Sequence, residues 1–203
     1  MLTVMVLGIA LSAGACGDGS PTPPPTAGTA SSPSAMTPSA TSTAAGAMYD
    51  AAGLDLCGRT DLSPLDSLSL KVVGTDPTPP RSGPGAACLF ELRPPGGQPA
   101  SLRVEATTLA SPEEASRLYR ATQAVTGMTA DGALAGVGEE AEGFTKQSDP
   151  GYKYAEYLIH ARRGNLVVKV WLAVGAEAFA PKEKLAAATL AITNGTLGLV
   201  PKA

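Results

Sequence analysis

The chain has 203 residues and a formal net charge of -3 at pH 7, with 15 Lys and Arg against 18 Asp and Glu. The basic residues are scattered, which argues against the clustered positive charge of a nucleic-acid-binding surface. The length is enough for one domain with a self-sufficient hydrophobic core.

The first segment predicts export from the cell. Residues 1–11 are almost wholly apolar, but a membrane-spanning helix needs about 20 such residues. Small residues follow at 12–15, and then Cys16, a pattern that resembles the bacterial lipobox. We expect a signal peptide over 1–15 and a diacylglyceryl anchor on Cys16, which would hold the protein on the extracytoplasmic face of the cell membrane. The alternative is a plain secretory signal with a chance cysteine.

Because no Lys or Arg precedes the apolar run, we expect the translation start to lie upstream of Met1.

A tether is predicted over residues 16–48. It consists almost entirely of Pro, Ser, Thr, Ala and Gly, and Asp18 is its only charge. Such a composition cannot bury enough apolar surface to offset the entropy of ordering the chain. We interpret it as a spacer between the membrane and a globular domain over 49–203. A partner-binding or O-glycosylated tail is the alternative.

The cysteine count predicts one disulfide. The chain has three cysteines, and lipid on Cys16 leaves Cys57 and Cys88. An oxidising exterior compartment favours their pairing. A redox dithiol is disfavoured because the C-x-x-C spacing is missing, and a zinc site is disfavoured because further ligands are missing. The segment 75–85 between them is rich in Pro and Gly, and we expect it to be a loop that the disulfide holds in place.

The first half of the domain predicts short helical pieces over 49–70, followed by two strands. Apolar and polar residues alternate over 86–92 and 101–108, which is strand periodicity. In the second strand Arg103 and Glu105 face outward. The intervening segment 93–100 is a hairpin-type loop.

A helix with a clear start is predicted next. Ser111 precedes Pro112, and Glu114 stands three positions after the serine, which is a capping box with proline at the first helical position. We expect Gly127 to end this helix. A Gly-rich link over 132–138 follows.

The second half predicts strands over 139–146, 152–162 and 166–174, with a tight turn at 163–165. The last strand has one wholly apolar face. A final helix is expected over 181–192, with Gly195 beyond its end. Strands joined by hairpins and covered by helices predict an α+β fold around an antiparallel sheet.

Several short motifs resemble a family of actinobacterial cell-envelope lipoproteins of unknown function. They are a first cysteine near the domain start (Cys57), a second on an early strand (CLFEL, 88–92), a G-x-G-[DE]-E-A stretch (136–141) and an R-G-N turn into an apolar strand (163–168). The match spans most of 57–192. The resemblance implies an envelope location and a compact α+β domain. It transfers no catalytic residue, because the family has none assigned.

Candidate chemistry in the sequence is sparse. His160 is the only histidine, and no G-x-S-x-G elbow is present, so we expect it to be structural and not catalytic. Glu139, Glu140 and Glu142 form an acidic cluster that is either a cation site or, as we favour, a solvated strand start. Trp171 lies opposite the apolar stripe of its strand. It either forms an exposed aromatic surface or, as we favour, packs under the amino-terminal segment or a loop.

Two functions remain open. We expect a non-enzymatic interaction module of the cell envelope that docks on another envelope protein or the cell wall. The alternative is a carrier or sensor of a small apolar ligand such as a lipid, held between the sheet and the Ala-rich final helix. No motif indicates a metal, a nucleotide or another cofactor, so none is expected.

Overall fold

The computed structural model describes residues 46–203, except 124 and 125. The predicted signal peptide, Cys16 and almost all of the tether lie outside the described residues. Within the described part of the chain, no helix is long and apolar enough to cross a membrane.

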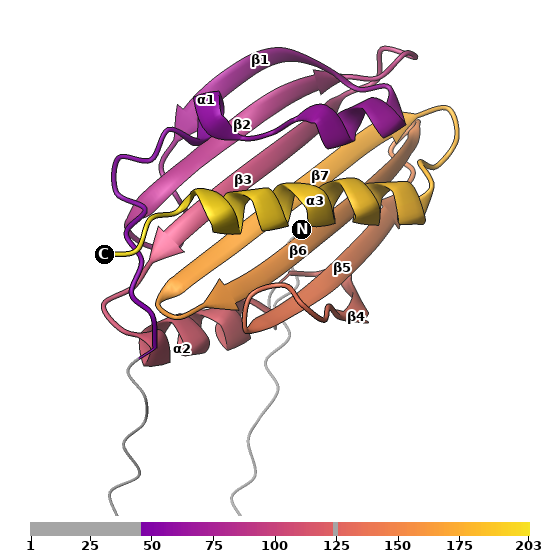
Figure 1. The fold of residues 1–203 in the computed structure, drawn as a ribbon. Coiled ribbons are helices and arrows are strands. Elements are labelled where there is room, and N and C mark those ends of the chain that lie inside the picture. Colours follow the sequence, from indigo (N-terminus) through magenta and orange to yellow (C-terminus); the bar gives the residue numbers. More distant parts are fainter. Residues whose placement is uncertain (1–45, 124–125) are drawn as a thin grey trace, which may run out of the picture. The chain divides into compact units, whose positions relative to one another are not determined.

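Seven antiparallel strands form one sheet in the order β1-β2-β3-β7-β6-β5-β4 (Figure 1). The strands are β1 (Lys71–Thr78), β2 (Gly85–Arg93), β3 (Ala100–Thr108), β4 (Thr129–Ala133), β5 (Glu140–Ser148), β6 (Lys153–Arg163) and β7 (Leu166–Ala176). The helices are α1 (Leu56–Arg59), the 3-10 helix η1 (Ser63–Leu68), α2 (Pro112–Gln123) and α3 (Lys182–Leu199).

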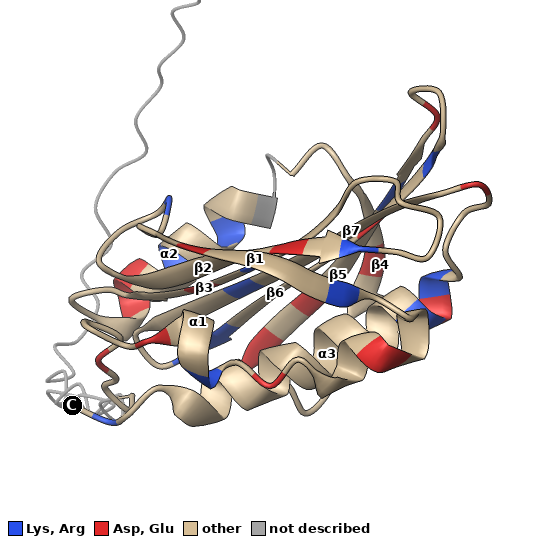
Figure 2. Ribbon diagram, turned by 90° about the horizontal axis from the view of Figure 1, so that it is seen from above, with Lys and Arg blue, Asp and Glu red and all other residues tan. Residues whose placement is uncertain are grey.

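The helices lie on both faces of the sheet and cover each face only in part. Helix α3 packs on β6, β7 and η1, whereas α2 packs on β6 and β7 from the opposite side (Figure 2). We call the face under α3 the core face and the face that α2 partly covers the outer face. The predicted α+β class is therefore confirmed, with incomplete helical cover.

The main core lies between the core face and α3. All five residues of the predicted apolar stripe of β7 are buried, and so are the three predicted contact residues of α3 (Leu166, Val168, Val170, Leu172, Val174, Leu185, Ala188 and Ile192). Burial of this apolar surface provides the main favourable contribution to folding.

The final helix packs on the core face of the sheet through a mixture of large and small side chains. The small residues on its face toward the sheet include the buried Ala188, Thr189 and Thr193. The hydroxyls of Thr189 and Thr193 donate to carbonyls four residues earlier, at 2.7 and 2.8 Å. Because these bonds satisfy the buried hydroxyls, the helix can lie close to the sheet.

Three predictions about elements are wrong. The segment expected as a loop from residue 75 begins within strand β1, which continues to Thr78. Strand β4 includes the start of the expected Gly-rich link. Helix α3 continues through Gly195 to Leu199. The buried Thr196 and Leu197 explain the extension, since their packing offsets the low helix propensity of glycine.

The predicted disulfide is present and joins α1 to β2. The Cα atoms of Cys57 and Cys88 are 5.2 Å apart. The enclosed segment contains η1 and the edge strand β1, so the bond ties these elements to the sheet.

Asn165 joins three segments at one end of the sheet. Its Oδ1 accepts from the backbone N–H of Tyr49 at 2.7 Å, and its Nδ2 donates to the carbonyls of Tyr49 and Leu109 at 3.1 and 2.8 Å. Tyr49 also forms a β-bridge with Lys202. The two ends of the domain therefore meet at the turn between β6 and β7, where Gly164 has the positive φ of 56° that favours glycine.

Replacing Asn165 by Ala is expected to lower the free energy of unfolding by about 2 kcal/mol, because two buried backbone groups of Tyr49 and the part-buried carbonyl of Leu109 lose a hydrogen bond. Urea titration followed by circular dichroism measures this. Asn194→Ala, at an exposed position of α3, is the matched control and should change the free energy by less than about 0.5 kcal/mol. Equal effects of the two substitutions would contradict the role assigned to Asn165.

Candidate ligand-binding site

The outer face brings polar and apolar side chains of β3, β7 and β6 into one patch. In the register of the sheet, Trp171 lies between Arg103 on β3 and Leu158 on β6. Lys169 likewise has Glu105 on β3 as its cross-strand partner. Because alternate residues of a strand share a face, these five side chains all point away from the core.

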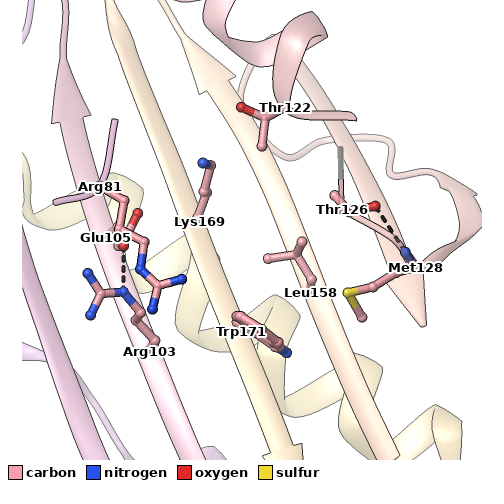
Figure 3. A pocket seen from close by; sticks show the side chains of 9 residues that line it. All are labelled: Arg81, Arg103, Glu105, Thr122, Thr126, Met128, Leu158, Lys169 and Trp171. Atoms are coloured by element: carbon pink, nitrogen blue, oxygen red, sulfur yellow. Dashed lines mark hydrogen bonds and ion pairs between the residues drawn. The ribbon is translucent and has the colours of Figure 1, made fainter. Parts of the chain in front are cut away.

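A cavity of about 200 Å³ lies over this patch (Figure 3). Its floor is formed by the sheet residues Arg103, Glu105, Leu158, Lys169 and Trp171. Its walls come from Thr122 on α2, from Thr126 and Met128 after that helix, and from Arg81 in the loop between β1 and β2. Four separate parts of the chain therefore enclose it.

Trp171 is partly buried at the floor of the cavity. Its Nε1 is inaccessible to solvent and has no hydrogen-bond partner among the described residues. The side chain is therefore not fully exposed, and it borders the cavity together with the loop residues Arg81 and Met128.

Arg103 and Glu105 neutralise each other at one side of the cavity. Their Nε and Oε1 atoms are 2.5 Å apart, and Glu105 is only 4% exposed. The remaining guanidinium nitrogens of Arg103 donate to Thr78 Oγ1 at 2.8 Å and to the carbonyl of Pro79 at 3.1 Å. Arg103 therefore has its donors engaged, and it ties β1 and the following loop to the floor.

Lys169 has a different environment. Its Nζ donates to Ser82 Oγ at 3.1 Å, and no carboxylate of the described residues forms an ion pair with it. Burial lowers the pKa of Lys169, Glu105 opposes that shift, and the charges of Arg81 and Arg103 add to it. The ammonium group is thus half-buried among positive charges.

His160 lies next to this patch but is fully buried. Its ring stacks on that of Tyr119 from α2, with 4.7 Å between the centroids. Burial, with a smaller contribution from Lys169, lowers the pKa of His160 to about 3, so the ring is neutral at physiological pH. Neither ring nitrogen has a hydrogen-bond partner among the described residues.

Two of the three glutamates of the acidic cluster form ion pairs with an arginine. Glu139 and Glu140 form ion pairs with Arg162 at 2.7 and 2.8 Å, and Glu142 lies opposite His160 in the register of β5 and β6. In the part of the chain that the structure describes, no group of three His, Cys, Asp or Glu side chains is placed to hold a metal ion.

Sequence reasoning identified Trp171 as a candidate but missed most of the site. Lys169 carried a usable signal, because it is the only charged residue in the apolar strand β7. No such signal exists in the sequence for Arg81, Thr126 and Met128, because they lie in loops whose position depends on the fold.

Comparisons with protein-family models, with curated proteins and with solved structures found no match to this chain.

Proposed function

We propose that the protein is an extracytoplasmic lipoprotein, anchored through Cys16, that binds a small molecule without chemical conversion in the cavity on the outer face. The observation that carries this proposal is the cavity of about 200 Å³ beside Trp171. It combines the apolar side chains of Leu158, Trp171 and Met128 with a few polar groups from several parts of the chain, as small-molecule sites commonly do.

The size of the cavity favours a small ligand. An engineered apolar cavity of about 150 Å³ accommodates benzene. A volume of about 200 Å³ suits a single ring or a short chain with one polar group. A long lipid tail would extend beyond it, so we favour a small molecule over a lipid.

Native mass spectrometry of the full chain, extracted in mild detergent from the envelope where it is made, tests the proposal. We expect a reproducible adduct on the wild-type protein, lost in Trp171→Ala because that change removes a wall of the cavity. Phe179→Ala, which removes an exposed aromatic ring elsewhere (37% exposed), is the control and should keep the adduct. A clean wild-type mass would contradict the proposal.

A docking module remains the second candidate, supported by the edge strand β1. Val72 and Val73 of this strand are 39% and 48% exposed. The register of β1 against β2 shifts at this point. An open edge with exposed apolar residues is a surface on which another chain can add a strand. Crosslinking in the envelope, lost in Val73→Lys, would favour docking over the small-molecule function.

A further inference from the structure

We propose that the ligand of the outer-face cavity is a small carboxylate with an aromatic ring or short apolar chain, its carboxylate at Lys169 and its apolar part on Trp171. This inference rests on the proposed function and adds the chemical class of the ligand.

The first argument is the charge around the cavity. Three cationic side chains line it, Arg81, Arg103 and Lys169, against the single carboxylate of Glu105. Glu105 forms its ion pair with Arg103, and neither Arg81 nor Lys169 forms an ion pair with a carboxylate of the described residues. The cavity therefore has an excess of positive charge.

The second argument is burial. A half-buried ammonium group without a counter-ion is unfavourable, because it has lost part of its hydration without gaining an ion pair. The pKa of Lys169 is lowered, first by burial and also by Arg81 and Arg103, and the opposing effect of Glu105 does not reverse this shift. A bound carboxylate would supply the missing counter-ion through a charge-assisted hydrogen bond.

The third argument is the spacing between the charged and apolar parts of the floor. Lys169 and Trp171 are two residues apart on one face of β7, a separation of about 7 Å along the strand. Leu158, opposite Trp171 in the register, and Met128 provide further apolar surface. A carboxylate at one end of a ring spans this distance.

Paired probes that differ only in charge test the inference on the full-length chain. Trp171 is the only tryptophan, so its indole N–H gives one NMR cross-peak that reports on the site. We expect benzoate to shift this peak and to bind at least about tenfold more tightly than the neutral benzamide, as a charge-assisted hydrogen bond would give.

Lys169→Met should remove that difference by weakening the binding of benzoate to the level of benzamide. Lys169→Gln is a second variant if Met disturbs folding. Lys146→Met, on the same face but outside the cavity, is the matched control and should leave the difference intact.

The outcomes separate the two proposals. Equal affinity for benzoate and benzamide in the wild-type protein would overturn the carboxylate inference and leave the small-molecule function standing. A preference for benzoate that survives in both Lys169 variants would overturn the role of Lys169. If neither probe shifts the Trp171 peak, both the cavity function and the ligand class are overturned.

Discussion

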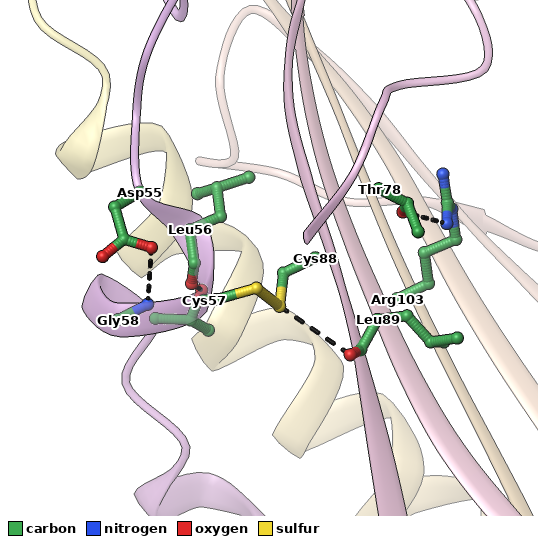
Figure 4. The surroundings of a disulfide bond; sticks show 9 residues. Asp55, Leu56, Cys57, Gly58, Thr78, Cys88, Leu89 and Arg103 are labelled. Atoms are coloured by element: carbon green, nitrogen blue, oxygen red, sulfur yellow. Dashed lines mark hydrogen bonds between the residues drawn. A yellow bond between two sulfur atoms is a disulfide. The ribbon is translucent and has the colours of Figure 1, made fainter. Parts of the chain in front are cut away.

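Removing the disulfide by replacing Cys57 and Cys88 with Ala is expected to lower the free energy of unfolding by about 3.7 kcal/mol. The bond joins residues 31 positions apart (Figure 4), and the loop-entropy relation gives this value for a loop of that length. For a domain of this size the loss corresponds to a fall in the melting temperature of about 10 °C. Thermal and urea unfolding of the double variant measure both quantities.

The enclosed segment explains why the structure depends on this bond. Strand β1 pairs only with β2, and most of its residues are exposed. Few buried contacts therefore hold β1 once α1 is released from β2. A reducing agent should lower the melting temperature of the wild-type protein and leave that of the double variant unchanged. A wild-type protein that is insensitive to reductant would contradict this account.

Acidification is expected to destabilise the protein through His160, by about 3 kcal/mol between pH 7 and pH 4. The pKa of His160 is about 3 in the folded protein and 6.5 in the unfolded chain. Between these values the unfolded chain binds more protons, so stability falls as the pH falls. The stability that depends on a neutral His160 is fully present above pH 6.5 and is lost progressively as the pH approaches 3.

Three other groups lie next to His160. Lys169 on β7 and Glu142 on β5 are its cross-strand partners, and Tyr119 stacks on its ring from α2. His160→Phe keeps a ring beneath Tyr119 but has no proton to bind. Urea titrations at several pH values should therefore show a flatter profile for His160→Phe than for the wild type. If the free energy of unfolding falls equally with pH in both proteins, the acid sensitivity comes from carboxylates and not from His160.

The sequence predicted those parts of the fold in which local chemistry and tertiary packing agree. The capping box is one example, since the backbone N–H of Glu114 donates to Ser111 Oγ at 3.2 Å and the carboxylate of Glu114 accepts from Ala110 at 3.3 Å. The alternation in β3 is another. Arg103 and Glu105 face outward as predicted, although Glu105 is buried there and forms an ion pair with Arg103.

The elements that the sequence missed are the two edge strands. Strand β1 contains Gly74 and Pro77, and β4 contains Gly132, residues that are depleted in strands. An edge strand needs a partner on one side only. The neighbouring strand can therefore impose the extended conformation on a segment whose residues have low strand propensity. No local pattern reveals this.

The candidate site was only partly predictable for a related reason. The outward position of Trp171 follows from strand periodicity, but the space above it depends on where α2 ends and where the loop with Arg81 runs. These positions are set by contacts between distant segments, among them the hydrogen bond of Lys169 to Ser82. Sequence spacing does not encode them.

The contacts of Asn165 also determine how the domain bears mechanical load. A force applied to the chain before Met48 would first load the hydrogen bonds between Asn165 and Tyr49 and the β-bridge between Tyr49 and Lys202. Asn165 lies in the turn between the adjacent strands β6 and β7, which are in the middle of the sheet. A force applied to this end of the domain would therefore act on central strands before it reached either edge strand.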